Sequence, residues 1–175
     1  MRVSFLAISA GLILASLPTA SDAQRADNDI FPRSVALQQQ GQAAQEAGDL
    51  NLAIDFYESA LAADPRNRSA IIALAQVARA QGLPGKAIGL YREALVLEPN
   101  DIVALTGQGE ALADKGALEL AREKLAEAQR VCGSKCPQVA ALEKTISSSA
   151  SQRVVAAEAL VPKPIVATVG TSNQN

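Results

Sequence analysis

The chain repeats itself at a spacing of 34 residues, and this period constrains its fold more than any single residue does. Three sets of small residues recur in step: Gly48, Gly82 and Gly116; Ala53, Ala87 and Ala121; and Ala60, Ala94 and Ala128. A fixed period of this length is typical of stacked helical arrays, because one unit cannot bury its apolar face alone. The spacing therefore predicts an all-α array rather than a globular enzyme fold.

Turn signals divide each unit into two helices. A glycine ends the first helix of each repeat, and Asp64-Pro65 and Glu98-Pro99 end the second helices of the first two, because a residue before proline avoids helical angles. We expect three repeats at 34–67, 68–101 and 102–135, within a domain that spans 34–148. A final helix from Pro137 to about Ser148 is predicted to cap the array at 136–148, since a terminal repeat needs a shield for its exposed face.

The segments outside the repeats predict export and disorder. Arg2 precedes an apolar run over 3–17, and small residues stand before Gln24, so residues 1–23 are predicted to be a signal peptide cleaved after Ala23. The run is shorter than the roughly 20 residues that span a bilayer, although an uncleaved anchor is the alternative. We expect the mature chain to be periplasmic or secreted, with disordered ends at 24–33 and 149–175.

The residues at matching positions resemble those of the tetratricopeptide repeat (TPR) family over about 34–148. Small residues stand where paired helices touch, and larger ones fill the neighbouring positions: Gly41, Ala75 and Gly109; Leu37, Ile71 and Leu105; and Tyr57, Tyr91 and Leu125. The resemblance implies a right-handed α-solenoid of three helix pairs plus a C-terminal capping helix. It also implies a non-catalytic scaffold or adaptor that binds a protein or peptide partner.

TPR proteins bind partners along a concave groove that is lined by the first helix of each repeat. Carried over to this chain, the resemblance implies a groove lined by Gln38, Gln42, Gln45, Ile72, Gln76, Arg79, Thr106, Glu110 and Asp114. The Lys, Asn and Arg clamp with which some members hold a C-terminal carboxylate is absent, because its positions hold Gln38, Gln42, Ala73, Val103 and Gly107. We therefore expect a ligand to meet amide groups, small apolar side chains and one cation, Arg79. The alternative is that these side chains form an ordinary solvated helix face.

Cys132 and Cys136 are the only cysteines in the chain. Export would place them in an oxidising compartment, and residues four apart across one turn can meet the Cα separation of roughly 4.4–6.8 Å that a disulfide tolerates. We expect a structural disulfide, an ending that also resembles that of exported TPR proteins from Gram-negative bacteria. The alternative is a redox or chaperone accessory that uses the pair, although active dithiols usually have two intervening residues.

Composition argues against catalysis. The chain has no histidine, which excludes a Ser–His or Cys–His nucleophile pair, and no glycine-rich phosphate loop follows a predicted strand. We expect no enzyme activity, cofactor, metal site or small-molecule substrate. The net charge is -2, and no basic stripe is present, so we expect no nucleic-acid binding. Membrane contact is expected only through residues 1–23 if they are not cleaved. The predicted function is a periplasmic interaction scaffold, in an assembly such as a pilus, secretion or outer-membrane biogenesis machine.

Overall fold

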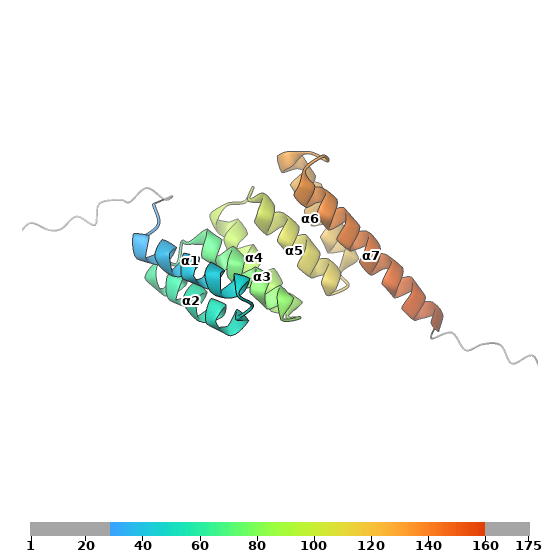
Figure 1. Cartoon of the computed structure of the whole chain (residues 1–175). Helices are drawn as coiled ribbons and strands as arrows, with labels where there is room; N and C mark the ends of the chain where they lie inside the picture. The colour runs from blue at the N-terminus through green and yellow to red at the C-terminus, as the bar shows by residue number, and fades with distance from the viewer. Residues whose placement is uncertain (1–28, 160–175) are drawn as a thin grey trace, which may run out of the picture.

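The computed structural model describes residues 29–159, with side chains to residue 152, and this part of the chain is entirely helical (Figure 1). Seven helices follow one another: α1 (Pro32–Glu46), α2 (Leu50–Ala63), α3 (Arg68–Ala80), α4 (Pro84–Leu97), α5 (Ile102–Asp114), α6 (Leu118–Cys132) and α7 (Pro137–Ala159). The prediction of an all-α solenoid of three helix pairs and a capping helix is confirmed. The predicted signal peptide, 1–23, lies outside the described residues.

The helix ends repeat with the same period as the sequence. After the first helix of each pair, a glycine adopts the left-handed conformation with φ of 72–82°, at Gly48, Gly82 and Gly116. Three helices begin at a polar side chain that accepts a hydrogen bond from a backbone N–H of the first turn: Asp49, Asn67 and Asp101. Local sequence thus sets where each helix starts and stops.

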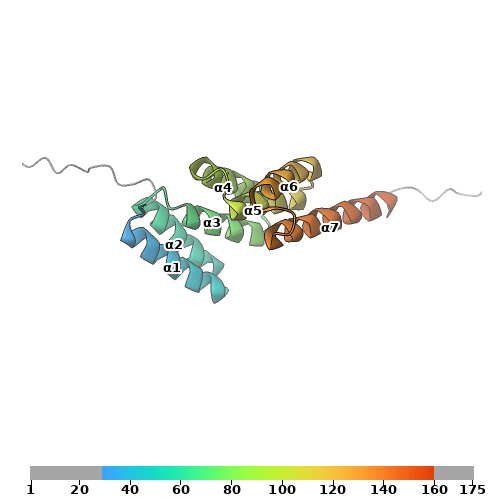
Figure 2. The same ribbon diagram turned by 90° about the horizontal axis from the view of Figure 1, so that it is seen from above.

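The helices form two layers (Figures 1 and 2). Each odd-numbered helix contacts the next odd-numbered one, from α1 to α3, α5 and α7. Over residues 29–159, the even-numbered helices contact odd-numbered helices but not one another. Because the odd-numbered helices are closer together, they line the inner side of the curved array, and their free faces form its concave surface.

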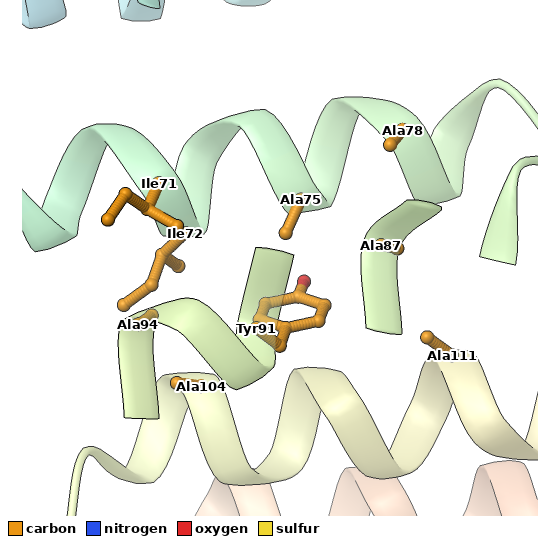
Figure 3. Packing of buried hydrophobic residues seen from close by; sticks show 9 residues of the cluster. All are labelled: Ile71, Ile72, Ala75, Ala78, Ala87, Tyr91, Ala94, Ala104 and Ala111. Atoms are coloured by element: carbon orange, nitrogen blue, oxygen red, sulfur yellow. The ribbon is translucent and has the colours of Figure 1, made fainter. Parts of the chain in front are cut away.

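The core is built from the residues that recur every 34 positions. Six alanines have no exposed surface and allow the helices to approach closely: Ala53, Ala60, Ala87, Ala94, Ala121 and Ala128. The larger volume comes from Tyr57 and Tyr91, which are 1% and 2% exposed. A Cβ built at Gly41 would lie 2.6 Å from Cε1 of Tyr57, so the absence of a side chain there makes room for the ring. Figure 3 shows the ring of Tyr91 between α3 and α5.

The first helix begins earlier than the sequence suggested. We expected disorder over 24–33, but Pro32 and Arg33 form the first turn of α1. Proline is well suited to the first helical position because its missing N–H is not needed there. The backbone N–H of Phe31 donates to Oδ2 of Asp64 at 3.0 Å, which fixes the entry to α1 against the end of α2.

The capping helix is longer than predicted. We expected it to end at about Ser148 and a disordered tail to begin at 149, but α7 continues to Ala159. The run of serines does not end the helix, because the serine hydroxyls bond back to carbonyls of the preceding turn. Ser147 and Ser151 donate to the carbonyls four residues earlier, and Ser148 donates to the carbonyl three residues earlier. None of the helices in 29–159 is long and apolar enough to cross a membrane.

The N-terminal half of α7 covers the end of the third repeat. Val139, Leu142 and Ile146 are buried against α5 and α6. Leu142 lies over Gly109 of α5, where a Cβ would be 2.7 Å from Cδ2 of the leucine. The capping role predicted for this segment is therefore carried by three apolar side chains spaced along one helix face.

Candidate functional site

Two adjacent hollows lie on the inner layer of helices. One, of about 490 Å³, lies between α3, α5 and the start of α7. The other, of about 480 Å³, lies between α1 and α3 and reaches the start of α5. Gln76 and Val103 line both, so the hollows form one continuous groove. All nine side chains predicted for the groove line it: Gln38, Gln42, Gln45, Ile72, Gln76, Arg79, Thr106, Glu110 and Asp114.

In the hollow between α1 and α3, polar side chains are paired with one another. The hydroxyl of Tyr57 donates to Oε1 of Gln45 at 2.8 Å. Burial and the negative charge of Glu46 raise the pKa of Tyr57 above its ordinary value. Glu46 and Asp101 are the charged residues that line this hollow, and Asp101 lies 2.8 Å from Nε of Arg68. The lining is therefore amide-rich and carries negative charge.

In the hollow between α3, α5 and α7, Arg79 is not the free cation that we expected. Its Nε donates to Oδ2 of Asp114 at 2.6 Å, and its Nη1 forms an ion pair with Oε2 of Glu110. Burial lowers the pKa of Arg79, but the hydrogen bond to Asp114 and the charges of both carboxylates outweigh burial and raise it. The ion pairs join α3 to α5, so Arg79 helps to hold neighbouring repeats together instead of facing a ligand as an unpaired charge.

Tyr91 also lines this hollow, and sequence reasoning assigned it only to the core. Within the part of the chain that the structure describes, its hydroxyl makes no hydrogen bond. Burial raises the pKa of Tyr91 to about 12, the charge of Arg79 opposes this, and the charges of Glu110 and Asp114 add to it. A comparison of repeats could have found this site: position 45, which holds the acceptor for Tyr57, corresponds to Arg79, which cannot accept a hydrogen bond.

The capping helix contributes to the groove as well. Gln138 and Ala141 of α7 line the hollow between α3, α5 and α7, whereas the sequence predicted groove residues only in the repeats. Two residues before Gln138, Cys136 lies beside Cys132 with their Cα atoms 5.8 Å apart and their Sγ atoms in contact. The cysteine pair lies at the turn from α6 to α7, next to the residues of α7 that reach the groove.

The groups that line the groove decide what it can bind. Among the side chains that the structure describes, in residues 29–152, no three His, Cys, Asp or Glu are grouped in a way that could hold a metal ion. The arrangement offers amide groups, a phenol hydroxyl, paired charges and small apolar side chains along α1, α3, α5 and α7. Such a surface suits an extended segment or a helix of another protein.

Comparison with known proteins agrees with this architecture. A tetratricopeptide repeat family model matches residues 39–102. No curated protein sequence matches the chain. Among solved structures, the Sgt2 TPR domain from Aspergillus fumigatus is similar with a TM-score of 0.65 and 24% identity, covering 85% of this chain and 97% of that one.

A second similar structure is the first TPR domain of human RPAP3, with a TM-score of 0.64 and 19% identity, covering 70% of this chain and 96% of that one. A third is the first TPR of Spaghetti (RPAP3) bound to the HSP90 peptide SRMEEVD, with a TM-score of 0.62, 19% identity, and coverage of 68% and 94%. Together with the 34-residue period and the stacked helix pairs, the family match over residues 39–102 supports a tetratricopeptide repeat array, and the similar structures show that the fold is that of TPR domains.

Proposed function

We propose that this protein is a non-catalytic scaffold that binds a segment of another protein in the groove along α1, α3, α5 and α7. The observation that carries the proposal is the continuity of the groove: the two hollows share Gln76 and Val103 and are lined from all three repeats and the cap. A groove of this length matches several turns of helix or an extended peptide rather than a compact small molecule.

Similar structures support this proposal at the level of fold. The Spaghetti TPR was solved with an HSP90 peptide, and the second TPR domain of human RPAP3 was solved with the HSP70 peptide SGPTIEEVD. Both peptides end in the sequence EEVD, in which three of the four residues are acidic. This chain has no basic clamp at the corresponding positions, so we propose a partner of different chemistry.

We also propose that the protein works outside the cytoplasm, as an adaptor in an envelope assembly such as a pilus, secretion or outer-membrane biogenesis machine. The support is the sequence of residues 1–23, with its positive start, short apolar run and small residues before Gln24. Intact mass measurement of protein recovered from a bacterial periplasmic fraction tests export. A chain that begins at Gln24 is expected, and a full-length chain retained in the membrane fraction would show an uncleaved anchor.

Photo-crosslinking in intact cells tests the groove directly. A photoreactive phenylalanine analogue placed at Gln76, which is exposed and lines both hollows, is expected to capture a defined partner protein. The matched control places the same analogue at Leu120, which is 50% exposed on α6 and outside both hollows. Adducts that are equal at both positions, or absent from Gln76, would show that the groove is not the binding surface.

We propose that Cys132 and Cys136 form a structural disulfide in the exported protein. The support is their geometry at the α6–α7 turn, where a bond between them would hold the cap that completes the groove. The alternative is a redox or chaperone accessory. Replacing both cysteines with serine separates the two: a structural bond affects thermal stability, whereas a redox role affects partner oxidation even at temperatures where the variant is folded.

A further inference from the structure

The hollow between α3, α5 and α7 departs from the repeat pattern in a way that indicates what it binds. In the first repeat, Tyr57 donates its hydroxyl proton to Gln45. The corresponding pair one repeat later is Tyr91 and Arg79, and here the arginine turns to the next repeat instead. The phenol oxygen of Tyr91 is therefore left without a partner among the described residues, although the side chain is only 2% exposed.

The hydroxyl of Tyr91 is accessible from the groove because α5 has a glycine beside it. A Cβ built at Gly107 would lie 2.7 Å from the hydroxyl oxygen and 2.6 Å from Cε1 of the ring, so any side chain there would crowd the ring. In Figure 3 the hydroxyl points from α4 toward α3. Gln76 and Arg79 of α3 line the hollow together with Tyr91. A buried polar group that opens into a hollow without a partner favours a ligand that supplies one.

The charges around the hydroxyl decide which ligand fits. The charged residues that line the hollow are Arg79, Glu110 and Asp114, so the arginine neutralises one of two carboxylates and the hollow keeps a net charge of -1. Arg79 bonds to one oxygen of each carboxylate, and the other oxygen of each has no donor among the described residues. Three acceptors, the two carboxylate oxygens and the phenol oxygen, therefore line one hollow.

An anionic ligand fits this arrangement poorly. To bind Arg79, it would have to displace two carboxylates and then lie beside them. The adjoining hollow offers no compensation, because its charged lining residues are Glu46 and Asp101. Like charges in a partly buried site repel strongly, since solvent screens them less there than at an open surface.

We propose that the hollow between α3, α5 and α7 binds an arginine or lysine side chain of the partner segment, held by Glu110, Asp114 and the hydroxyl of Tyr91. The inference rests on the proposed groove function and specifies the chemistry of its partner. The cation donates N–H groups to the free carboxylate oxygens and to the phenol oxygen, and it balances the remaining negative charge. Charge-assisted hydrogen bonds of this kind are about twice as strong as neutral ones.

Four pools of dodecapeptides provide the test, each randomised at every position except a fixed central Arg, Lys, Gln or Glu. Binding of each fluorescent pool to the purified full chain is measured by anisotropy. The Arg and Lys pools are expected to bind about tenfold more tightly than the Gln pool, and the Glu pool most weakly. Glu110→Gln and Asp114→Asn should each remove most of this preference, and Tyr91→Phe should reduce it about threefold.

Two further variants serve as controls for net charge and for misfolding. Glu123→Gln removes the same charge from an exposed position on α6 outside both hollows, and it should leave the preference unchanged. Arg79→Gln frees both carboxylates, so it should raise the affinity for the Arg and Lys pools, a gain that misfolding cannot produce. Circular dichroism confirms that each variant is folded.

The outcomes distinguish a failure of the proposed groove function from a failure of the proposed cation site. If no pool binds more tightly to the wild type than to a Gln76→Trp variant with a filled groove, the proposed groove function fails. If pools bind in the groove with equal affinity, or the Glu pool binds best, the groove function stands and the cation site is wrong. An equal loss of preference in Glu123→Gln and Glu110→Gln would also refute the site, because net charge alone would then explain the preference.

Discussion

The contact between Leu142 of α7 and Gly109 of α5 provides a quantitative test of how the cap is held. Leu142 has no exposed surface, and Leu112 and Ile146 belong to the same buried cluster. A methyl group at position 109 would lie 2.7 Å from Cδ2 and 3.0 Å from Cδ1 of the leucine. The leucine side chain has no space for another rotamer, because it packs in a buried cluster with Leu112 and Ile146. Substitutions at the two positions should therefore depend strongly on each other.

The expected free energies follow from this geometry. Leu142→Ala removes three buried carbons, about 2.4 kcal/mol at about 0.8 kcal/mol for each, and the remaining cavity raises the loss to about 3–4 kcal/mol. Gly109→Ala alone should destabilise by about 1 kcal/mol, because overpacking of about 2 kcal/mol exceeds the helical gain of about 1 kcal/mol. In the Leu142→Ala background the two contacts with the leucine methyl groups are gone and the 3.3 Å contact with Cβ of Lys124 remains. The same Gly109→Ala change should then stabilise by about 1–2 kcal/mol.

The wild type, the two single variants and the double variant form a double-mutant cycle. Urea unfolding followed by far-UV circular dichroism gives the free energy of unfolding of each protein from its transition midpoint, provided that all four have the same slope. The predicted coupling between the positions is about 2–3 kcal/mol, with a change of sign in the effect of Gly109→Ala. Leu120→Ala is the matched control: this leucine is 50% exposed on α6, so its loss should be about 1 kcal/mol. If Gly109→Ala destabilises equally with either residue at 142, then Leu142 does not lie over Gly109 and α7 does not pack on α5 through this contact.

Three further predictions concern the tyrosines and the cysteine pair. At pH 7, Tyr57→Phe should lower the free energy of unfolding by about 1 kcal/mol because Gln45 loses its donor, whereas Tyr91→Phe should change it by less than about 0.5 kcal/mol; equal losses in urea titrations would contradict this. Because the pKa of Tyr91 is raised from 10.0 to about 12, the folded state keeps a proton that the unfolded chain releases. The stabilisation is complete below about pH 10 and is lost, by up to about 2.7 kcal/mol, as the pH rises through 12. Tyr91→Phe should show a smaller decline over that window, and parallel curves would refute the shift. Replacing Cys132 and Cys136 with serine should lower the free energy of unfolding by about 2 kcal/mol. Reductant should lower the Tm of the wild type, measured by calorimetry, but not that of the variant. If reductant lowers the Tm of both proteins, this would count against the disulfide.

The sequence alone predicted most of the fold because the signals are local and repeated. Glycines in the left-handed conformation and Asx caps set the helix ends, and alanines at 34-residue intervals set where helices can touch. The same reasoning was wrong at both ends of the array. There, Pro32 starts a helix because Phe31 is tied to Asp64 of α2, and serines extend α7 through bonds within the helix.

The groove was predictable only in part. The repeat register identified which side chains would share the inner face, since equivalent positions in stacked repeats face the same way. It did not identify their pairing. Arg79 bonds to Glu110 and Asp114, which lie 31 and 35 residues further along the chain, in the next repeat. Which of several polar neighbours a long side chain reaches depends on the distance between α3 and α5, and repeat spacing does not specify that distance.

By itself, the sequence determined the period, the helix pairs and the concave face, because these follow from local backbone preferences and from the need of each unit to bury an apolar side. Only the tertiary structure decided the chemistry of that face. It brought Arg79 to the carboxylates of α5, left the hydroxyl of Tyr91 without a partner within the part of the chain that the structure describes, and placed Gln138 of the cap beside them. Charge balance in a groove depends on which side chains meet in space, and residues from different repeats meet only after the helices have stacked.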